Sequence, residues 1–504
     1  MGQERLAIGK FIAELREERG ITQGALAKTL HTSQSAIARM EAGRQNFSTE
    51  MLAKIGNVLG RGILALSKGI SFEIEGGHKL SGRIEVKASK NSAVALLCAS
   101  LLNRGKTILR SMPRIEEVSR IVEVLTSIGV SVRWLNQSDV EIVPPRKLKL
   151  GAIDDDAARK TRSIIMLMGP LMHLVTGFKL PYAGGCRLGK RSVQPHLYAL
   201  EKLGLSVKTA DGWYACRAAP ANPGKLVMYE NGNTPTENAI MAAARVKGVV
   251  EIRRAASNYM VHDLCHFLEK LGVRIEGIGT HTLRVHGVPD IDTDVEFWPG
   301  EDPIEAMTLL SIAATTNSPI TIARCPIDFL DLELLKLEKM GMKFQIGRTY
   351  KAKNGYTDLV DIKCTDASHL VALDDKLEAH DDPGMNVDSL PYFAPIAASA
   401  KGQTLIHDFM YENRAIYYME LNKLGADITL ADVHRAYING PTKWRAGEVI
   451  CPPALRPAVI ILIAMLAARG KSMLRNVYSI NRGYEDLAAR LNRLGAKIRV
   501  VPSL

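Results

Sequence analysis

Cysteine pairs of the kind that form disulfides or hold metal ions are missing from this 504-residue chain. Its seven cysteines are odd in number and widely spaced, and they include no CxxC pair. Disulfide-stapled secreted domains and structural zinc sites both need paired cysteines. The sequence therefore argues against a disulfide framework and predicts no metal site.

Long apolar runs are also scarce. The longest, AVIILIAMLAA at residues 458–468, falls short of the roughly 20 residues that cross a bilayer and predicts a buried helix instead. The sequence starts MGQERLAIGKF, which is charged and lacks the apolar stretch of a secretory signal. We therefore expect a cytoplasmic protein with no membrane partner.

The composition excludes disordered, collagenous and coiled-coil chains, because 46% of the residues are hydrophobic and 23% are charged. At ~150 residues per domain, the length predicts about three domains. Lys and Arg number 65 against 53 Asp and Glu, which gives a net charge of +12. This excess indicates an anionic partner, and nucleic acid, an acidic membrane surface or a phosphorylated substrate would each fit.

Residues 1–66 differ from the rest because they are helical in period and rich in helix-start signals. Gly20 fits the end of a first helix. Thr22 is placed to cap a second, Thr32 or Ser33 a third, and Ser48 a fourth. The segment therefore predicts a small all-α domain.

Two short helices separated by HTS are typical of a helix-turn-helix. The segment ITQGALAKTLHTSQSAIARMEAGR resembles the Cro/C1-type (XRE-like) DNA-binding domains. The resemblance implies that the second of these helices enters the major groove and that DNA is a candidate partner. The matching contact positions are Gln23, Ser33, Gln34, Ser35 and Arg39. A protein-docking or vestigial module is the alternative, because fold alone does not settle function.

The remainder of the chain consists of repeats. One phrase recurs as LTSIGVSV, LEKLGLSV, LEKLGVRI, LEKMGMKF, LNKLGADI and LNRLGAKI. Each copy reads as the end of an amphipathic helix, a glycine in the left-handed cap position, and a short strand. The glycines are Gly129, Gly204, Gly272, Gly341, Gly425 and Gly495.

A second helix precedes each phrase and is apolar on nearly all sides, as in NSAVALLCASLL and RPAVIILIAMLAA. A helix of this kind belongs in a core. The six units therefore predict helices inside and sheets outside, which inverts the ordinary α/β barrel. Three units per lobe would give two similar lobes with a cleft between them.

This pattern resembles the enolpyruvyl transferase family over about residues 71–504. Within it, the segments KLSGRIEVKASKNSAVALL, GGCRLGKR, VDS, ENR and INRGYEDLAARLNRLGAKI resemble the branch acting on UDP-N-acetylglucosamine rather than the shikimate branch. The implied fold is a two-lobed inside-out α/β barrel of six βαβαβ-type repeats. The expected domains are the helix-turn-helix at 1–66, lobe 1 at 71–89 plus 298–504, and lobe 2 at 90–297.

Charged and polar residues recur at two positions of the unit. The N-terminal ends of the buried helices carry Lys90, Asn91, Arg162, Asp388 and Arg456, and the turns before the second helices carry Arg191, Arg414 and Arg482. Equivalent turns of pseudo-symmetric units should face one another across the cleft. A helix N-terminus adds amide donors to each cation, so the sequence predicts an anion site there.

The resemblance implies a role for each of these basic residues. Lys90, Arg191 and Arg482 match the positions that hold phosphoenolpyruvate. Arg414 and Arg456 match further basic positions of the same pocket.

On the acceptor side, Arg162 matches a residue that faces the nucleotide diphosphate, and Asn91 matches the contact to the amino sugar. Asp388 matches the aspartate beside the attacking sugar hydroxyl, where a carboxylate can act as general base.

Cys186 lies in the segment PYAGGCRLGKRS. The preceding glycines permit a tight loop, and the neighbouring cations Arg187, Lys190 and Arg191 should lower the pKa of the thiol. The resemblance implies that this cysteine adds to phosphoenolpyruvate and aids product release. The other six cysteines are expected to be packed in the core.

The implied reaction moves the enolpyruvyl group of phosphoenolpyruvate to the 3-hydroxyl of UDP-N-acetylglucosamine and releases phosphate. This is the first committed step of peptidoglycan precursor synthesis and needs no cofactor. We expect Cys186, Asp388, Lys90 and Arg482 to be catalytic.

Three departures from the family pattern concern mainly the acceptor half of the site. Ser192-Val193-Gln194-Pro195 replaces Pro-Val-Asp-Leu, Glu116-Glu117 replaces Lys-Asp, and NGNTPTEN at 231–238 replaces a Lys-Val-Ser-Val-Gly stretch. Two alternatives follow: a transferase that uses a different nucleotide-sugar acceptor, or a DNA-binding regulator with an idle transferase-like sensor domain.

Overall fold

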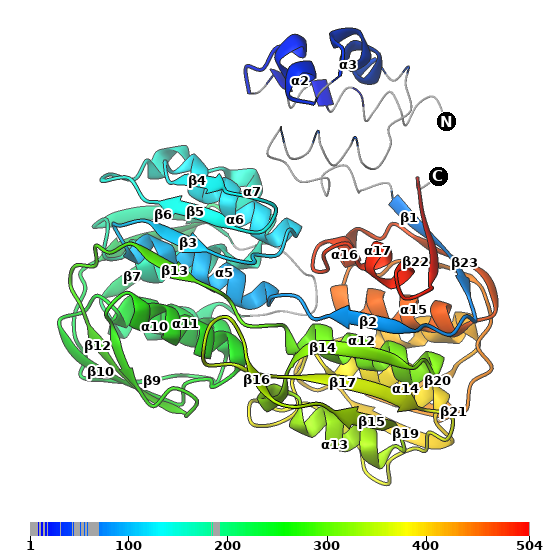
Figure 1. Cartoon of the computed structure of the whole chain (residues 1–504). Helices are drawn as coiled ribbons and strands as arrows, with labels where there is room; N and C mark the ends of the chain where they lie inside the picture. Colours follow the sequence, from blue (N-terminus) through cyan, green and yellow to red (C-terminus); the bar gives the residue numbers. More distant parts are fainter. Residues whose placement is uncertain are drawn as a thin grey trace.

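The computed structural model describes residues 70–182, 184 and 192–502, together with residues 9, 12–13, 16–17, 19–30, 32–42, 44, 51, 55 and 58 of the N-terminal module. The predicted helix cap Ser48 lies outside these residues. Figure 1 shows two lobes of helices and sheets, with the helices of the N-terminal module drawn in dark blue.

Two short helices of the N-terminal module are described, α2 (Gln23–Thr29) and α3 (Gln34–Glu41). The predicted cap Thr22 accepts a hydrogen bond from the Ala25 amide at 3.2 Å. Of the two candidates for the next cap, Ser33 takes the position and accepts from the Ala36 amide at 3.2 Å. The helices pack through a small buried cluster that includes Leu26, Ile37 and Met40.

The rest of the chain forms two separate hydrophobic cores. One draws on residues 93–297, and the other on residues 72–86 together with 304–498. We call the parts built on these cores lobe 2 and lobe 1. The chain passes between the lobes twice, and an isolated bridge from Ala88 to Glu301 ties the two crossings together.

Lobe 2 has three sheets. The first sheet has the strand order β13 (Val295–Phe297), β3 (Thr107–Leu109), β5 (Val140–Val143), β4 (Ser131–Trp134). The second has the order β6 (Gly177–Pro181), β8 (Trp213–Ala218), β7 (Leu205–Ala210). The third has the order β11 (Arg274–Glu276), β12 (Thr282–Gly287), β10 (Gly248–Arg253), β9 (Lys225–Val227). Its helices are α5 (Lys90–Ala99), η3 (Ser100–Leu102), α6 (Glu116–Ser127), η4 (Leu150–Ala152), α7 (Asp155–Arg159), η5 (Arg162–Leu167), α8 (Met168–Leu171), α9 (Gln194–Lys202), α10 (Asn233–Ala243) and α11 (Tyr259–Lys270), where η denotes a 3₁₀ helix.

Lobe 1 also has three sheets. The first sheet has the strand order β22 (Glu448–Ile450), β23 (Gly470–Arg475), β1 (Ile70–Gly76), β24 (Lys497–Pro502). The second has the order β15 (Lys343–Ile346), β17 (Asp358–Asp366), β14 (Ile320–Pro326), β2 (Gly82–Glu85), and β16 (Tyr350–Lys351) also pairs with β17. The third has the order β18 (Leu377–Glu378), β19 (Gly402–His407), β21 (Arg435–Gly440), β20 (Asp427–Leu430). Its helices are α12 (Pro303–Thr316), η6 (Ile327–Phe329), α13 (Asp331–Lys339), η7 (Leu390–Tyr392), α14 (Phe393–Ser399), η8 (Ala415–Leu424), α15 (Leu455–Ala467), α16 (Tyr478–Asn481) and α17 (Leu487–Asn492).

The helices predicted to be apolar on every side are the ones enclosed by the sheets (Figure 1). Helix α12 is buried from Pro303 to Thr315, and α15 from Leu455 to Leu466. The prediction of helices inside and sheets outside is confirmed. Helix α15 contains the longest apolar run of the sequence, which confirms its assignment to a buried helix.

All six repeat glycines adopt the left-handed conformation that the pattern predicts, with φ between +91° and +99°. Each follows a surface helix and turns the chain into the next strand. The helix before Gly425 differs slightly from expectation, because it is the 3₁₀ helix η8.

No helix in the described part of the chain is both long and apolar enough to span a membrane.

Two of these glycines form a matched pair for a stability test. An added methyl group at Gly272 would meet no atom within 4 Å, whereas at Gly204 it would lie 2.0 Å from the carbonyl oxygen of Ala219. Both substitutions incur the strain of a left-handed alanine, about 1–2 kcal/mol. We expect Gly272→Ala to lower the free energy of unfolding by about that amount, and Gly204→Ala to lower it at least twice as much.

Urea unfolding monitored by circular dichroism measures the free energy of unfolding of both variants, whose substitutions lie in the same lobe. Equal losses would contradict the close approach of the Ala219 carbonyl to Gly204.

Candidate active site

The first predicted site residues lie at the start of α5. Ser89 caps this helix by accepting a hydrogen bond from the Ser92 amide at 3.2 Å. Lys90 is the first helical residue, and its ammonium group lies 2.7 Å from Oε2 of Glu117. Ser163 donates to the other carboxylate oxygen of Glu117 at 3.1 Å. The lysine predicted to bind phosphoenolpyruvate is thus already paired with a carboxylate.

The charge of Glu117 joins the two lobes electrostatically. Burial raises the pKa of the Glu117 carboxyl, but the cations Lys90 and Arg482 outweigh burial and lower the pKa to about 2. Lys90 belongs to lobe 2 and Arg482 to lobe 1, directly after α16. Within the described residues, Arg482 forms no ion pair, so its guanidinium can take an anionic ligand.

The neighbouring departure, Glu116, makes a direct contact between the lobes. Its Oε1 accepts a hydrogen bond from the Tyr478 hydroxyl of lobe 1 at 2.5 Å and pairs with Arg120 at 3.0 Å. Glu116 is only 3% exposed. Both acidic residues that replace the family's Lys-Asp pair therefore have structural partners at the lobe boundary.

Asp388 precedes η7 and lies between two guanidinium groups. Its Oδ2 is 3.3 Å from Nη2 of Arg456, and its Oδ1 is 3.8 Å from Nη1 of Arg414. The Asp388 side chain keeps 26% of its surface exposed. A carboxylate held on one side by cations and open on the other is suited to accept a proton from a bound hydroxyl.

Arg414 is enclosed more fully than its predicted role implies. It is 0% exposed, and it donates to both carboxylate oxygens of Asp408, at 2.6 and 2.8 Å, and to the Val387 carbonyl at 2.8 Å. In this arrangement Arg414 holds the segment that carries Asp388 through its contact with the Val387 carbonyl. A direct contact between Arg414 and a substrate stays a prediction.

Arg456 is 7% exposed and belongs to a buried hydroxyl network of lobe 1. Its Nη1 donates to the Tyr484 hydroxyl at 2.9 Å. The Tyr484 hydroxyl also lies 2.6 Å from that of Thr308 and 2.5 Å from that of Tyr392. The network fixes the guanidinium that contacts Asp388.

The segments that depart from the family on the acceptor side lie together. Arg162, the first residue of η5, donates to the Ser192 carbonyl at 3.1 Å. The buried ring of His196 contacts the Thr234 hydroxyl at 3.3 Å and the Asn238 amide at 3.2 Å. Burial and Arg162 lower the pKa of His196 to about 3. Helix α9, which begins within the altered segment 192–195, therefore packs against the altered segment 231–238 through His196.

Two predicted site residues, Cys186 and Arg191, lie outside the described residues, so their roles stay predictions. The other six cysteines are all buried, as expected. Burial raises the thiol pKa of each of them, which leaves them unreactive.

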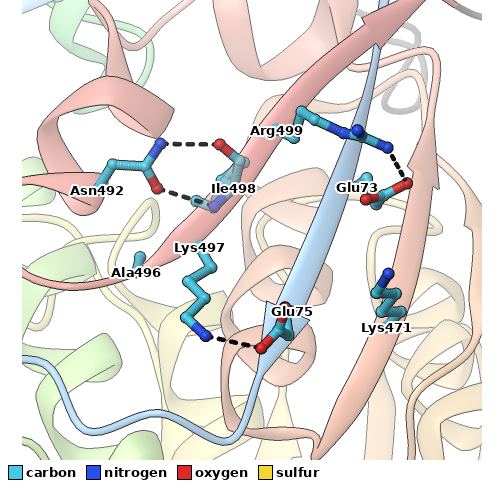
Figure 2. Close-up of a pocket in the computed structure, with 8 residues that line it drawn as sticks. All are labelled: Glu73, Glu75, Lys471, Asn492, Ala496, Lys497, Ile498 and Arg499. Atoms are coloured by element: carbon cyan, nitrogen blue, oxygen red, sulfur yellow. Dashed lines mark hydrogen bonds and ion pairs between the residues drawn. The ribbon is translucent and has the colours of Figure 1, made fainter.

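A shallow hollow of about 290 Å³ lies over the sheet formed by β1, β23 and β24 (Figure 2). Two ion pairs lie along it, Lys497 with Glu75 and Arg499 with Glu73, each at 2.8 Å. None of the predicted site residues that the structure describes lines this hollow. We interpret it as a solvated sheet face.

Sequence reasoning missed one residue at the lobe boundary, Tyr259 at the start of α11, whose hydroxyl accepts a hydrogen bond from Asn91 at 3.1 Å. It occupies the turn before the second helix of its unit, where Arg414 and Arg482 stand in other units. The repeat marks this position, but the residue there is a tyrosine and not a cation.

The fold is that of the enolpyruvyl transferases. The structure of the enolpyruvyl transferase NikO from Streptomyces tendae aligns with a TM-score of 0.74 at 23% identity, covering 87% of this chain and 100% of that one. Residues 74–499 match the family described as EPSP synthase (3-phosphoshikimate 1-carboxyvinyltransferase). The chain belongs to this family.

The alignment with curated relatives covers nearly the full length of those proteins. The UDP-N-acetylglucosamine 1-carboxyvinyltransferase of Bradyrhizobium diazoefficiens is 34% identical over 434 residues, which are 86% of this chain and 98% of that protein. The protein of the same name from Helicobacter pylori is 31% identical over 85% of this chain and 98% of its own length. Residues 12–66 match a helix-turn-helix family, which confirms the predicted N-terminal domain.

The Lys90–Glu117 pair predicts a pH-dependent contribution to stability. Glu117→Gln keeps the shape of the side chain but leaves Lys90 unpaired, and we expect a loss of about 3 kcal/mol at pH 7, as for other largely buried pairs. The folded-state pKa of about 2 lies below the ordinary value of 4.5. The contribution is therefore complete above about pH 4.5 and is lost as the pH falls toward 2, so about half should remain at pH 3.

Urea unfolding at pH 7 and pH 3 measures this difference. Glu141→Gln, which removes an exposed pair with Arg133 in the same lobe, is the matched control and should cost below about 1 kcal/mol. If Glu117→Gln lowers the free energy of unfolding equally at both pH values, the stabilising pair between ionised Glu117 and Lys90 is contradicted.

Proposed function

We propose that this protein transfers the enolpyruvyl group of phosphoenolpyruvate to the 3-hydroxyl of UDP-N-acetylglucosamine, releasing phosphate and committing the sugar nucleotide to peptidoglycan synthesis. The observation that carries the proposal is the meeting of the two lobes. Asp388, held by Arg456 in lobe 1, acts electrostatically on Tyr259 of lobe 2, which accepts a hydrogen bond from Asn91. The names of the curated relatives support the same reaction.

Phosphoenolpyruvate carries a carboxylate and a phosphate, so its site needs several cations without strong internal partners. Arg482 meets this requirement, and Arg191 is proposed to join it from the GGCRLGKR segment. Lys90 would exchange part of its contact with Glu117 for the ligand. Because Glu117 stays ionised, it keeps the Lys90 ammonium group oriented.

In the proposed addition step, a proton is added to C3 of phosphoenolpyruvate, and C2 acquires oxocarbenium character. The sugar 3-hydroxyl oxygen bonds to C2, and its proton passes to the carboxylate of Asp388. The adduct is tetrahedral at C2 and still carries the phosphate. Cations fixed before the reaction stabilise its charge without reorganisation.

In the elimination step, C3 loses a proton, the double bond between C2 and C3 re-forms, and the C2–O bond to phosphate breaks. The product is the enol ether of the sugar nucleotide together with inorganic phosphate. Cys186, in its basic glycine-rich segment, is proposed to add to phosphoenolpyruvate and to assist product release.

The acceptor is proposed to contact Asn91 through its amino sugar and Arg162 through its diphosphate. The altered residues Gln194 and Thr234 lie on the same side of lobe 2. Gln194 retains an acceptor oxygen for the uracil imide but not the charge of the family's aspartate.

The N-terminal module is proposed to bind DNA. Ser33, Gln34, Ser35 and Arg39 are exposed along α3, and such side chains can bond base edges or phosphates. Gln23 has a different environment, because its amide donates to Glu41 at 2.8 Å. Glu41 is also held by Arg16 at 2.6 Å, so the Gln23 side chain takes part in the module's own hydrogen bonding.

Asp388→Asn tests the chemistry. We expect phosphate release from phosphoenolpyruvate and UDP-N-acetylglucosamine to fall by at least about 100-fold, because a general base contributes 10²–10⁴-fold. Cys186→Ala should abolish turnover as well. The readout is a coupled phosphate assay at saturating substrates.

Asp427→Asn, at an exposed position of β20, is the control and should retain full activity. No phosphate release by the unaltered protein with UDP-N-acetylglucosamine or a panel of other nucleotide sugars would contradict the proposed function.

Gln34→Ala tests the DNA proposal. Loss of a base contact should weaken binding to the DNA upstream of the protein's own coding sequence by about tenfold or more and should leave binding to random DNA nearly unchanged. Fluorescence anisotropy at low salt measures both affinities. Lys225→Ala, on an exposed strand of lobe 2, is the control. Failure of the unaltered protein to bind this DNA at low salt would contradict the proposal.

A further inference from the structure

Tyr259 occupies a buried position where lobe 2 meets lobe 1. It is the first residue of α11 and is 4% exposed. Its ring packs edge-on against Phe329 of lobe 1, with ring centroids 5.9 Å apart at an angle of 71°. The ring is therefore held between the lobes and cannot swing away while they are in contact.

The hydroxyl of Tyr259 lies among residues that the reaction needs. It accepts a hydrogen bond from Nδ2 of Asn91 at 3.1 Å. The Ser89 hydroxyl, which caps α5, acts on the phenol electrostatically, as do the charges of Asp302, Asp388 and Arg456. One phenol thus contacts the acceptor-binding end of α5 and also lies in the electrostatic field of the carboxylate proposed as the base.

The phenol keeps its proton throughout the working pH range. Burial raises the pKa of Tyr259 well above its ordinary value, and Asp302 and Asp388 raise it further, while Ser89 and Arg456 act in the opposite direction. A protonated phenol can accept from Asn91 and also donate to an oxygen of a sugar or a carboxylate.

We propose that Tyr259 is a positioning residue for the acceptor, which fixes the Asn91 carboxamide relative to Asp388 across the lobe boundary. The inference rests on the proposed function, because it assigns the orientation of the same acceptor. One N–H of Asn91 is used on the phenol, so its second N–H and its carbonyl oxygen remain for the sugar. Without the phenol, the amide would gain rotational freedom and lose a partner in a partly buried site.

The placement also links acceptor binding to contact between the lobes. Phe329 fixes the Tyr259 ring from lobe 1, while Asn91 engages its hydroxyl from lobe 2. The amide is therefore oriented only when both lobes contribute, and at that point Asp388 is also in place to take the hydroxyl proton.

Tyr259→Phe removes the hydroxyl and keeps the ring. We expect the KM for UDP-N-acetylglucosamine to rise about tenfold, because an orienting hydrogen bond to a partly buried amide is lost. The KM for phosphoenolpyruvate should change less than about twofold. Steady-state kinetics with each substrate varied in turn, together with calorimetric binding of UDP-N-acetylglucosamine, measure these quantities.

Tyr356→Phe is the matched control. The Tyr356 hydroxyl also reaches from one lobe to the other and donates to Asp263 of α11. Its ring packs against that of His266, with centroids 3.9 Å apart and the planes tilted by 31°. It contacts none of the residues proposed to bind the acceptor. We expect Tyr356→Phe to lower thermal stability about as much as Tyr259→Phe and to leave the KM for the acceptor unchanged.

A double-mutant cycle with Asn91→Ala gives a second readout. The effects of Tyr259→Phe and Asn91→Ala on the acceptor KM should be strongly non-additive, and those of Tyr356→Phe and Asn91→Ala additive. An unchanged acceptor KM in Tyr259→Phe, an equal rise for both substrates, or additive effects with Asn91→Ala would each overturn the inference. If the unaltered protein neither turns over nor binds the acceptor, the proposed function itself has failed, which is a separate outcome.

Discussion

Each repeat unit contains a helix that is apolar on nearly every face, and such a helix is stable only when it is enclosed. Helices α12 and α15 meet this requirement at the centre of lobe 1, with sheets around them. The second helix of each unit then stays at the surface, and the left-handed glycine after it returns the chain to the outer sheet. Burial of the central helices therefore determines the architecture and directs their polar N-terminal ends toward the lobe boundary.

The polar residues at these ends carry charge into a largely buried region, and the structure offsets that cost with specific partners. Lys90 is paired with Glu117, Arg414 with Asp408, and Arg456 with Asp388 and Tyr484. Each pair belongs to a single lobe, whereas Arg482 acts on Glu117, Tyr478 donates to Glu116 and the Tyr259 ring packs on Phe329 across the boundary. The site is thus pre-arranged within each lobe and becomes complete where the lobes meet.

The repeats, the buried helices and the caps at Thr22 and Ser33 could be predicted from the sequence because each depends on local periodicity and local hydrogen bonding. The positions of Lys90, Arg162, Asp388 and Arg456 at helix starts followed from the same pattern. The contact of Glu116 with Tyr478 and the role of Tyr259 could not be predicted, because they depend on how segments far apart in sequence pack. Tyr259 and Asn91, for example, are 168 residues apart. The pairing of Arg414 with Asp408 is local in sequence, but it depends on how the turn between β19 and η8 folds, which the repeat pattern does not specify.

The central claim is that residues of both lobes form one site, in which Asn91 holds the acceptor sugar and Asp388 takes its proton. A crystal structure of the full chain bound to UDP-N-acetylglucosamine and phosphoenolpyruvate tests it most directly. The account predicts the sugar 3-hydroxyl within hydrogen-bond distance of the Asp388 carboxylate, with Asn91 in contact with the same sugar and still bonded to Tyr259. A sugar nucleotide bound to one lobe alone, with its sugar away from Asp388, would contradict it.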